Sequence, residues 1–511
     1  MTYDRAGRAV KTASPDYRKP GEATAAKVVT TKQYDALGNL LSVTGPDGVI
    51  TRYRYDQLNR PVERTDPNPE AGDQPGGVWQ YGYTTEGELR FTTDPTGSRV
   101  EATYDDLGRQ VTATELGRRP APAAYTTKLR YDDAGNLVSS TAPTGELTKN
   151  EYDVLGQRIV TRDPAGVVSQ YGYDFAGRQV RQSDGHGRTG YVSHDPAGRA
   201  TGFYSLDPGE HVLRKSAAGY DADGNKVSVT DALGRTTRFG YDSRGLLVQQ
   251  QEPVSDTSSI TTSFGYDAAG NRTRSTDGRG NSTIETYNVL GLSESVIELA
   301  TAAHPAAADR TWTTSYDLAG QPARVQAPGG VVRERTFDAL GLLRLETGSG
   351  AAQPTPDRVQ RFDLTGRLLA VNAPSGEKTF TYDDRGDLLT STGPLSGTAT
   401  YSYDGSGRVD GSGTAVFGYD KARLSTQKDG LTGVEQKLGY DDAGNLGSID
   451  YGGGRIRTYG YDDLGRQKSD GLKGADGTPL ATLEYDSKRS LSAESTRLGC
   501  NETAAYRRMW I

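Results

Sequence analysis

Residues 152–172 read Y-D-V-L-G-Q-R-I-V-T-R-D-P-A-G-V-V-S-Q-Y-G, and this 21-residue stretch decides the fold. It contains two D-x-x-G tetrapeptides, which begin at Asp153 and Asp163. Aspartate favours the first position of a type I turn, because its carboxylate accepts the backbone amide two residues on. Glycine favours the last position of a three-residue hairpin loop, which takes a positive φ and forms a G1 bulge. The stretch therefore predicts one hairpin of an antiparallel meander.

The Tyr-Asp-x-x-Gly pattern recurs along the chain, which indicates a tandem repeat. Tyrosine holds the first place in 19 of 22 copies, and 11 of the 21 spacings are 21 residues. The copies begin at Tyr3, Tyr34, Tyr55, Tyr83, Tyr104, Tyr131, Tyr152, Tyr173, His194, Tyr220, Tyr241, Tyr266, Tyr287, Tyr316, Phe337, Phe362, Tyr382, Tyr403, Tyr419, Tyr440, Tyr461 and Tyr485. Twenty-two hairpins correspond to about 44 short strands.

Aromatic residues two apart precede many of these turns, as in Tyr171 and Tyr173. Residues i and i+2 of a strand share a face, so many repeats should place two rings on one face of the sheet. The longer spacings carry their extra residues at the second D-x-x-G turn, which predicts long loops on one rim and tight turns on the other. The clearest insertions are Asp66 to Gly77, Gly117 to Tyr125, Ala300 to Asp309 and Gly348 to Asp357.

The composition favours an ordered chain without large aliphatic cores. Hydrophobic residues make up only 34%, whereas there are 65 glycines and 30 tyrosines. The net charge of -7 is small for 511 residues, which argues against disorder. Buried tyrosine requires a hydrogen-bond partner for its hydroxyl, so we expect a tyrosine layer with such partners. The mildly acidic net charge provides no positive surface field, which disfavours nucleic acid as a partner.

The compartment is only partly constrained. Cys500 is the single cysteine, so no intrachain disulfide forms. No run of about 18 apolar residues predicts a membrane span. The first residues, M-T-Y-D-R-A-G-R, have no signal-peptide pattern.

The Y-D-x-x-G-R-x-x-x-x-x-D-P-x-G unit resembles the RHS/YD repeats of bacterial polymorphic toxins, insecticidal toxin complexes, wall-associated proteins and teneurins. The resemblance covers residues 1–486. It implies an all-β fold, in which tandem antiparallel hairpins form a spiral, β-cocoon-like YD shell. In the toxin members such a shell encloses a C-terminal toxin, and in the teneurin-like members it is a cell-surface scaffold. A β-propeller is the alternative fold, but it needs units of roughly 40 residues.

The chain departs from this pattern at its end. After Tyr485 and Asp486 the repeat stops, and no G-R-F stretch like that of the toxin shells' core segment occurs. We therefore expect residues 487–511 to be a disordered or truncated tail, and the chain to be an internal or truncated piece of an incomplete shell. We expect the full-length protein to be secreted or displayed at the cell surface.

We expect a non-catalytic shell or scaffold that encapsulates or presents a C-terminal toxin for interbacterial competition or secretion. Its partners would be that toxin, which this chain lacks, and the toxin's immunity protein. The alternative is an adhesin-like cell-surface scaffold that binds glycans or partner proteins through its outer face or rim loops. An array of exposed tyrosines and arginines could stack on sugars, although the rings are better explained as packing within the wall.

No residue is predicted to be catalytic or to bind a cofactor or metal. A calcium loop needs several converging oxygens, whereas each D-x-x-G turn supplies one aspartate whose place the turn already explains. Residues 185–190 match G-x-G-x-x-G but fall at a second turn and not between a strand and a helix. The histidines, His186, His194, His211 and His304, have no zinc-site spacing, and His194 replaces a repeat tyrosine. Nothing around Cys500 suggests an activated thiol.

Overall fold

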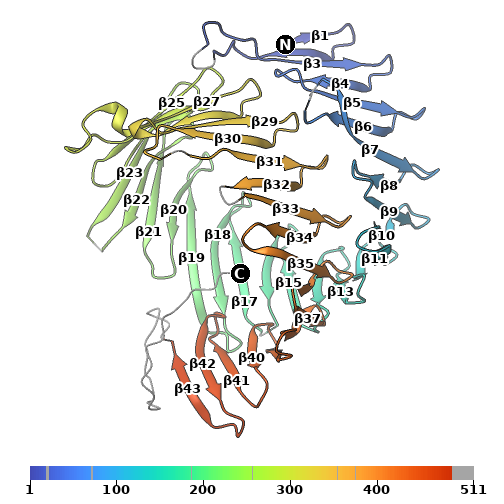
Figure 1. Cartoon of the computed structure of the whole chain (residues 1–511). Coiled ribbons are helices and arrows are strands. Elements are labelled where there is room, and N and C mark those ends of the chain that lie inside the picture. The colour runs from blue at the N-terminus through green and yellow to red at the C-terminus, as the bar shows by residue number, and fades with distance from the viewer. Residues whose placement is uncertain are drawn as a thin grey trace. The chain divides into compact units, whose positions relative to one another are not determined.

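The computed structural model describes residues 1–18, 22–70, 73–185, 187–255, 257–353, 355–373 and 376–485. This part of the chain is all-β, with 43 strands and two short 3-10 helices, Ala307–Arg310 (η1) and Pro328–Gly330 (η2) (Figure 1). The predicted fold class is confirmed, and the strand number agrees with the expected one. Over the same residues, no helix has the length and apolar character needed to cross a membrane. The predictions for His186, Cys500 and residues 487–511 lie outside the described residues.

The chain forms two compact units, which are described separately. Of the described residues, unit 1 contains those within 1–129, 216–401 and 405–407, and unit 2 contains those within 130–215, 402–404 and 408–485. Strands β11 (Ala123–Tyr131), β19 (Val212–Tyr220) and β35 (Gly397–Tyr403) run from one unit into the other.

The other strands of unit 1 are β1 (Thr2–Tyr3), β2 (Ala9–Ala13), β3 (Val29–Tyr34), β4 (Leu40–Thr44), β5 (Ile50–Tyr55), β6 (Pro61–Pro67), β7 (Pro75–Tyr83), β8 (Leu89–Thr93), β9 (Arg99–Tyr104), β10 (Gln110–Gly117), β20 (Lys226–Thr230), β21 (Thr236–Tyr241), β22 (Leu247–Pro253), β23 (Ser259–Tyr266), β24 (Arg272–Thr276), β25 (Ser282–Tyr287), β26 (Ser293–Ile297), β27 (Thr311–Tyr316), β28 (Pro322–Gln326), β29 (Val332–Phe337), β30 (Leu343–Ser349), β31 (Arg358–Phe362), β32 (Leu368–Ala373), β33 (Gly376–Tyr382) and β34 (Leu388–Gly393).

The other strands of unit 2 are β12 (Leu137–Thr141), β13 (Leu147–Tyr152), β14 (Arg158–Arg162), β15 (Val168–Tyr173), β16 (Gln179–Ser183), β17 (Thr189–His194), β18 (Ala200–Leu206), β36 (Val409–Ser412), β37 (Ala415–Asp420), β38 (Arg423–Lys428), β39 (Glu435–Tyr440), β40 (Leu446–Asp450), β41 (Ile456–Tyr461), β42 (Gln467–Lys473) and β43 (Pro479–Glu484).

The hairpin that joins β13 to β14 has the predicted geometry. The Gly156 amide donates to the Asp153 carbonyl at 3.0 Å, and the Asp153 amide donates to the Gln157 carbonyl at 2.9 Å. Gly156 has a φ of 75°, which a residue with a Cβ adopts at a cost. The register shifts by one residue at Tyr152, so a bulge adjoins the turn. The D-x-x-G corner therefore folds the chain back with a type I turn and a G1 bulge.

The sheet buries very little. The chain exposes 31874 Å², whereas a compact globular protein of this length exposes roughly 18,000 Å². Among the described residues, the buried hydrophobic side chains are Tyr17, Val28, Val332 and Ala370. A second packed layer therefore does not cover most of the sheet, and its stability must come from contacts along and between hairpins.

All four predicted insertions fall at second turns, as expected. Two of them are not loops over their whole length. Strands β6 and β7 continue their ladder to the pair Pro67 and Pro75, and β10 and β11 continue theirs to Gly117 and Ala123. The extra residues lengthen these hairpins because an antiparallel ladder can be extended from its open end, and proline is tolerated there, at strand ends.

Candidate functional site

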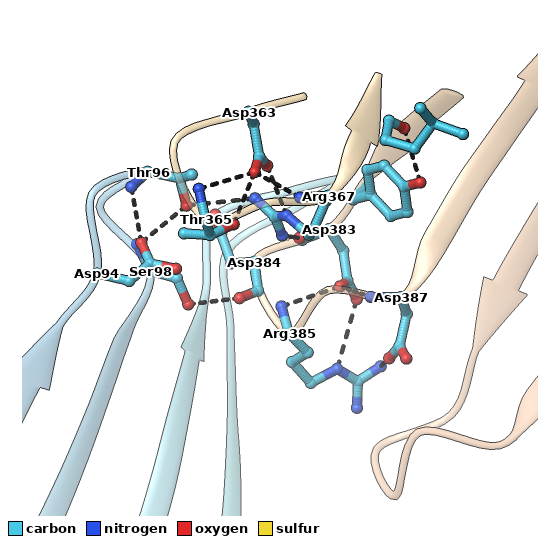
Figure 2. Close-up of polar contacts among 12 residues, drawn as sticks. Asp94, Thr96, Ser98, Asp363, Thr365, Arg367, Asp383, Asp384, Arg385 and Asp387 are labelled. Atoms are coloured by element: carbon cyan, nitrogen blue, oxygen red, sulfur yellow. Dashed lines mark hydrogen bonds and ion pairs between the residues drawn. The ribbon is translucent and has the colours of Figure 1, made fainter. Parts of the chain in front are cut away.

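The YD turn, formed by the Asp-x-x-Gly of each repeat, is closed by its own aspartate. In the turn after β31, one Asp363 carboxylate oxygen accepts the amides of Thr365 and Arg367, each at 2.9 Å. The other oxygen accepts the Arg367 Nε at 2.6 Å (Figure 2). Burial raises the pKa of Asp363, but the Arg367 amide and the other donors outweigh it and hold the pKa below its ordinary value.

Among the described residues, the same contact recurs wherever a YD turn keeps its aspartate and its usual length. The carboxylate accepts the amide four residues on in the turns of Asp4, Asp35, Asp56, Asp105, Asp132, Asp153, Asp174, Asp195, Asp221, Asp242, Asp267, Asp317, Asp338, Asp363, Asp383, Asp404, Asp441 and Asp462. Thr84 and Asn288 replace aspartate and accept the equivalent amides through Oγ1 and Oδ1. The aspartates thus serve as turn acceptors, the role predicted from sequence.

The residue after the turn glycine links neighbouring repeats. The Arg367 guanidinium donates to the Asp383 carbonyl of the next YD turn at 3.0 Å and lies 5.4 Å from the ring centre of Tyr382. Arg8 does the same with the Asp35 carbonyl, at 3.2 Å, and the Tyr34 ring, at 4.8 Å. One arginine therefore joins its own turn, the next turn and the next repeat's tyrosine.

The repeat tyrosines supply the opposite link. Tyr382 donates its hydroxyl to the Leu368 carbonyl of the preceding repeat at 2.8 Å, and burial raises its pKa. The same bond joins Tyr34 to Ala9, Tyr55 to Leu40, Tyr83 to Pro61, Tyr104 to Leu89, Tyr152 to Leu137, Tyr173 to Arg158, Tyr241 to Lys226, Tyr266 to Leu247, Tyr287 to Arg272, Tyr316 to Ser293, Tyr419 to Val409, Tyr440 to Leu424 and Tyr461 to Leu446. The sequence predicted that a partner exists but not that it is this carbonyl.

Within unit 1, a seam joins turns that are far apart in the sequence. Figure 2 shows the second turn of Asp94, Thr96 and Ser98 facing the YD turns of residues 363–366 and 383–386. The Ser98 hydroxyl donates to the Asp384 carbonyl, and the Arg367 guanidinium contacts the Thr96 hydroxyl at 3.4 Å. These pairs are separated by 286 and 271 residues in the sequence.

Asp384 is the most strongly held side chain of this seam. The Arg118 guanidinium donates to its two carboxylate oxygens at 2.6 and 3.1 Å, and the carboxylate side chain is only 5% exposed. Burial raises the pKa of Asp384, but the side-chain and backbone donors of Arg118 bring it below its ordinary value. The pair therefore stays ionised over the physiological range.

A second charged group lies beside it. The Arg385 side chain is 8% exposed, pairs with Asp383 at 3.4 Å and Asp387 at 3.3 Å, and covers the Tyr125 ring at 4.1 Å. Burial and the neighbouring Asp383 raise the pKa of Asp387, although Arg385 opposes them. A cavity of about 190 Å³ adjoins these residues and is lined in part by Trp79, Asp384 and Arg385. It is large enough only for water or a very small ligand.

Two further contacts extend the unit 1 seam. Arg344 forms an ion pair with Glu70 at 2.7 Å, and the Tyr316 amide donates to the Tyr17 hydroxyl at 3.1 Å. The latter pair is 299 residues apart. Tyr17 is one of the few buried rings, so this end of the seam combines an apolar contact with a hydrogen bond.

Unit 2 contains a seam of the same kind. Arg408 pairs with Glu146 at 2.7 Å, and Arg423 approaches Asp163 at 3.4 Å. These partners are 262 and 260 residues apart. In each unit, then, YD turns of late repeats lie against second turns of early repeats. The chain returns to contact itself after about thirteen repeats, a relationship that the repeat pattern alone does not reveal.

One YD turn at the unit 2 seam is a residue shorter than the others. Lys421 and Ala422 form it alone and have φ angles of 48° and 68°, unusual for residues other than glycine. A cavity of about 580 Å³ lies beside this turn, lined in part by Val167, Arg423 and Tyr440. The shortened turn leaves space where a full turn would fill the seam.

The remaining predicted residues are dispersed. His194 lies at the end of β17, and its Nδ1 is buried without a hydrogen-bond partner among the described residues. His211 pairs with Asp207 at 3.0 Å, and His304 lies in the loop after β26. The described part of the glycine-rich stretch, residues 185 and 187–190, belongs to a hairpin closed by Asp184 and Arg188. Across the part of the chain that the structure describes, no three His, Cys, Asp or Glu side chains converge as metal ligands would.

Comparisons with known proteins agree with this geometry. The RHS Repeat family model matches residues 34–71, 131–168 and 220–253, and the Teneurin YD-shell model matches residues 336–473. No curated protein matches the chain.

Solved structures share the fold at low identity. Two TcdB2-TccC3 crystal structures, one of them a TEV form, match with TM-scores of 0.61 and 0.60, both at 16% identity and over 93% of this chain. A Photorhabdus luminescens Tc holotoxin pore matches with a TM-score of 0.61 at 14% identity over 94% of this chain. The chain spans about a third of those solved chains, 31% to 32% of their length. The chain therefore carries RHS repeats and a segment similar to the Teneurin YD-shell, and its all-β fold matches the RHS/YD shell fold.

Proposed function

We propose that this chain is a wall segment of a YD-repeat shell that encapsulates or presents a C-terminal toxin. The observation that carries the proposal is the seam: within each unit, distant repeats lie edge against edge. A meander that returns to contact itself in this way extends a wall in two directions, as a container requires. A single ribbon of hairpins would extend in one direction only.

The hydrogen bonds of the repeat side chains support a structural role. The repeat aspartates accept turn amides, the arginines bridge neighbouring turns, and the tyrosine hydroxyls donate to backbone carbonyls. Groups committed to such bonds are poor candidates for acid–base or nucleophilic chemistry, which requires a group that is free to react. We therefore propose that the chain acts as a scaffold and not as a catalyst.

The proposed cargo and setting follow from the neighbours. One of the solved structures that share the fold is a Tc holotoxin pore. By analogy, the partner proposed here is a toxin domain on the C-terminal side, accompanied by its immunity protein, in a secreted or cell-surface protein used in competition between bacteria. The proposed role thus rests on the shared fold, and the proposal concerns the class of cargo, a toxin domain.

Two measurements test the proposal together. Reading the coding sequence on both sides of the chain should reveal more YD repeats and a separate domain after the array. When that full-length protein is treated with protease, the C-terminal domain should survive while R118A and D384A variants expose it. A full-length protein with no further domain, or one cleaved equally in both variants and the wild type, would contradict encapsulation.

A second role, glycan binding, is favoured by one observation in unit 2. Tyr191 and Tyr204 stack with ring centres 4.9 Å apart, and Tyr204 is exposed. Neither tyrosine begins a repeat, and within the described residues neither hydroxyl forms a hydrogen bond. A sugar could stack on such a pair. Binding to a glycan array that a Tyr204→Ala variant loses would support this role, and no binding above background would count against it.

A further inference from the structure

One repeat arginine lacks the aspartate of its own turn. In the YD turns of usual length that are followed by arginine, the arginine pairs with the turn aspartate at 2.6 to 2.7 Å; these arginines are Arg8, Arg60, Arg109, Arg178, Arg199, Arg367, Arg408 and Arg466. In the shortened turn, Arg423 lies directly opposite Asp420 in the ladder. Among the described residues, Arg423 forms no ion pair with Asp420, and its charged partner is Asp163 at 3.4 Å. The Arg423 guanidinium therefore has donors that the other arginines use within their own turns.

The unit 2 seam is open at this repeat. One repeat earlier, Glu146 pairs with Arg408 at 2.7 Å, and one repeat later, Arg188 donates to the Asp463 carbonyl at 3.3 Å. Glu146 and Arg188 each follow the glycine of a second turn. Val167 holds the same position in the second turn between them, and its side chain cannot form such a bond. Both sides of the seam thus lose a contact at the place where the cavity of about 580 Å³ lies.

This cavity has the size and the apolar wall of a ligand pocket. Its volume falls in the range of about 300–1,000 Å³ that small-molecule sites occupy. Val167 and Leu438, both half-buried, line it together with Tyr440. The Tyr440 hydroxyl is held by the Leu424 carbonyl at 2.8 Å, so the ring is fixed in place. We name this cavity the short-turn pocket.

The charged groups of the short-turn pocket carry both signs. Lys421 and Arg423 supply two cations, and Asp420 and Asp442, both exposed, supply two carboxylates. Asp441 also lines the pocket, but its carboxylate accepts the Ala443 and Asn445 amides at 3.1 and 2.7 Å within its own turn. A ligand that carries only one charge would meet repulsion from half of the exposed charges. A ligand that carries both signs would be complementary to all of them.

We propose that the short-turn pocket binds a small zwitterion, a free α-amino acid with an apolar side chain. Its carboxylate would accept the guanidinium donors of Arg423, which suit a planar carboxylate. Its ammonium group would lie by Asp420 and Asp442, and its side chain on Val167 and Leu438. The site lies within unit 2 and requires neither a cargo nor a second chain.

Isothermal titration calorimetry of the full chain with three related probes tests the proposal. L-Leucine carries both charges, N-acetyl-L-leucine only the carboxylate, and L-leucinamide only the ammonium group. L-Leucine should bind with a dissociation constant of about 1 mM or below, and each of the other two at least about tenfold more weakly. No heat of binding with L-leucine, or equal affinity for all three probes, would overturn the proposal.

A one-residue insertion provides the sharpest variant. A glycine inserted between Ala422 and Arg423 restores D-K-A-G-R, the usual YD turn, and should return the guanidinium to Asp420. Tyr419 already pairs with Leu424, as Tyr461 pairs with Gln467 in a turn of usual length, so the insertion leaves the ladder unchanged. Binding of L-leucine should fall at least about tenfold. Unchanged binding would show that the shortened turn does not create the site.

Arg423→Met removes the carboxylate partner and should weaken L-leucine binding at least about tenfold while leaving the weak binding of L-leucinamide unchanged. Arg466→Met is the matched control, because Arg466 holds the same repeat position in unit 2 but pairs with its own Asp462 at 2.7 Å. It should leave L-leucine binding unchanged. Equal losses in the two arginine variants would contradict the proposed site, and circular dichroism would verify that both variants retain the sheet.

Discussion

Arg118 and Asp384 lie 266 residues apart in the sequence, and the guanidinium of one donates to both carboxylate oxygens of the other. The two partners differ in their surroundings. The Asp384 side chain is 5% exposed, whereas the Arg118 side chain is 50% exposed. The loss of either partner breaks the same contact but leaves a different group behind.

Arg118→Ala should therefore destabilise the unit 1 seam more than Asp384→Ala. Without the guanidinium, a buried carboxylate keeps its charge with fewer donors, which costs about 3 kcal/mol. Without the carboxylate, Arg118 can turn to water, and the cost is about 1–2 kcal/mol. Hydrogen exchange of the amides around residues 94–98 would measure both. Equal protection losses in the two variants would contradict the asymmetry, and Arg54→Ala, at an exposed pair, is the control.

Asp363 allows a test of the turn acceptor. Asp363→Ala removes the acceptor of the Thr365 and Arg367 amides and should cost about 1–2 kcal/mol of local stability. Asp363→Asn should cost less, because Asn288 already accepts the equivalent amides in its own turn. Urea unfolding followed by hydrogen exchange at residues 358–373 would separate the two variants. Equal losses would show that charge and not the acceptor closes the turn.

Tyr382 and Phe362 form a natural pair of controls for the tyrosine bond. Tyr382→Phe deletes the hydroxyl that donates to Leu368 and should cost about 1 kcal/mol. Phe362→Tyr adds a hydroxyl at the same repeat position and should be neutral or stabilising, because the preceding repeat offers its own carbonyl. Thermal unfolding of both variants provides the measurement. Destabilisation by Phe362→Tyr would show that the tyrosine partner is specific to particular repeats.

The hairpins could be predicted from sequence because their determinants are local. Asp153 and Gly156 fix one turn, and the turn geometry fixes the register of β13 and β14. Each turn and each strand register is determined by residues that are close in the sequence. The pattern of one repeat unit was therefore enough to predict that the chain folds into short antiparallel strands joined by tight turns. The extended pairing of β6 with β7 was missed, because an insertion's length does not show whether it continues a ladder.

The seam could not be predicted, because its position depends on small changes in twist that add up over many hairpins. Which second turn meets the Asp384 turn depends on the accumulated twist of about thirteen hairpins and on every insertion between them. A change of a few degrees in each hairpin would move the contact to another repeat. In retrospect one signal was present in residues 382–387, which read Y-D-D-R-G-D. This is the YD turn whose two central positions hold an acidic and a basic residue, Asp384 and Arg385.

The two carboxylates near Arg385 should give the seam opposite responses to pH. The folded pKa of Asp384 lies below its ordinary value of 3.8. Its stabilising contribution is therefore fully present above 3.8 and is lost as the pH falls from there through the folded pKa. The folded pKa of Asp387 lies above 3.8, so its contribution is largest below that value and is lost as the pH rises through the folded pKa. Asp384→Asn should therefore remove the loss of seam stability at acid pH. Asp387→Asn should raise stability near neutral pH and leave the acid loss in place. Hydrogen exchange at residues 94–98 in a series from about pH 6 to pH 3 distinguishes them, and parallel profiles for the two variants would show that neither group controls the seam.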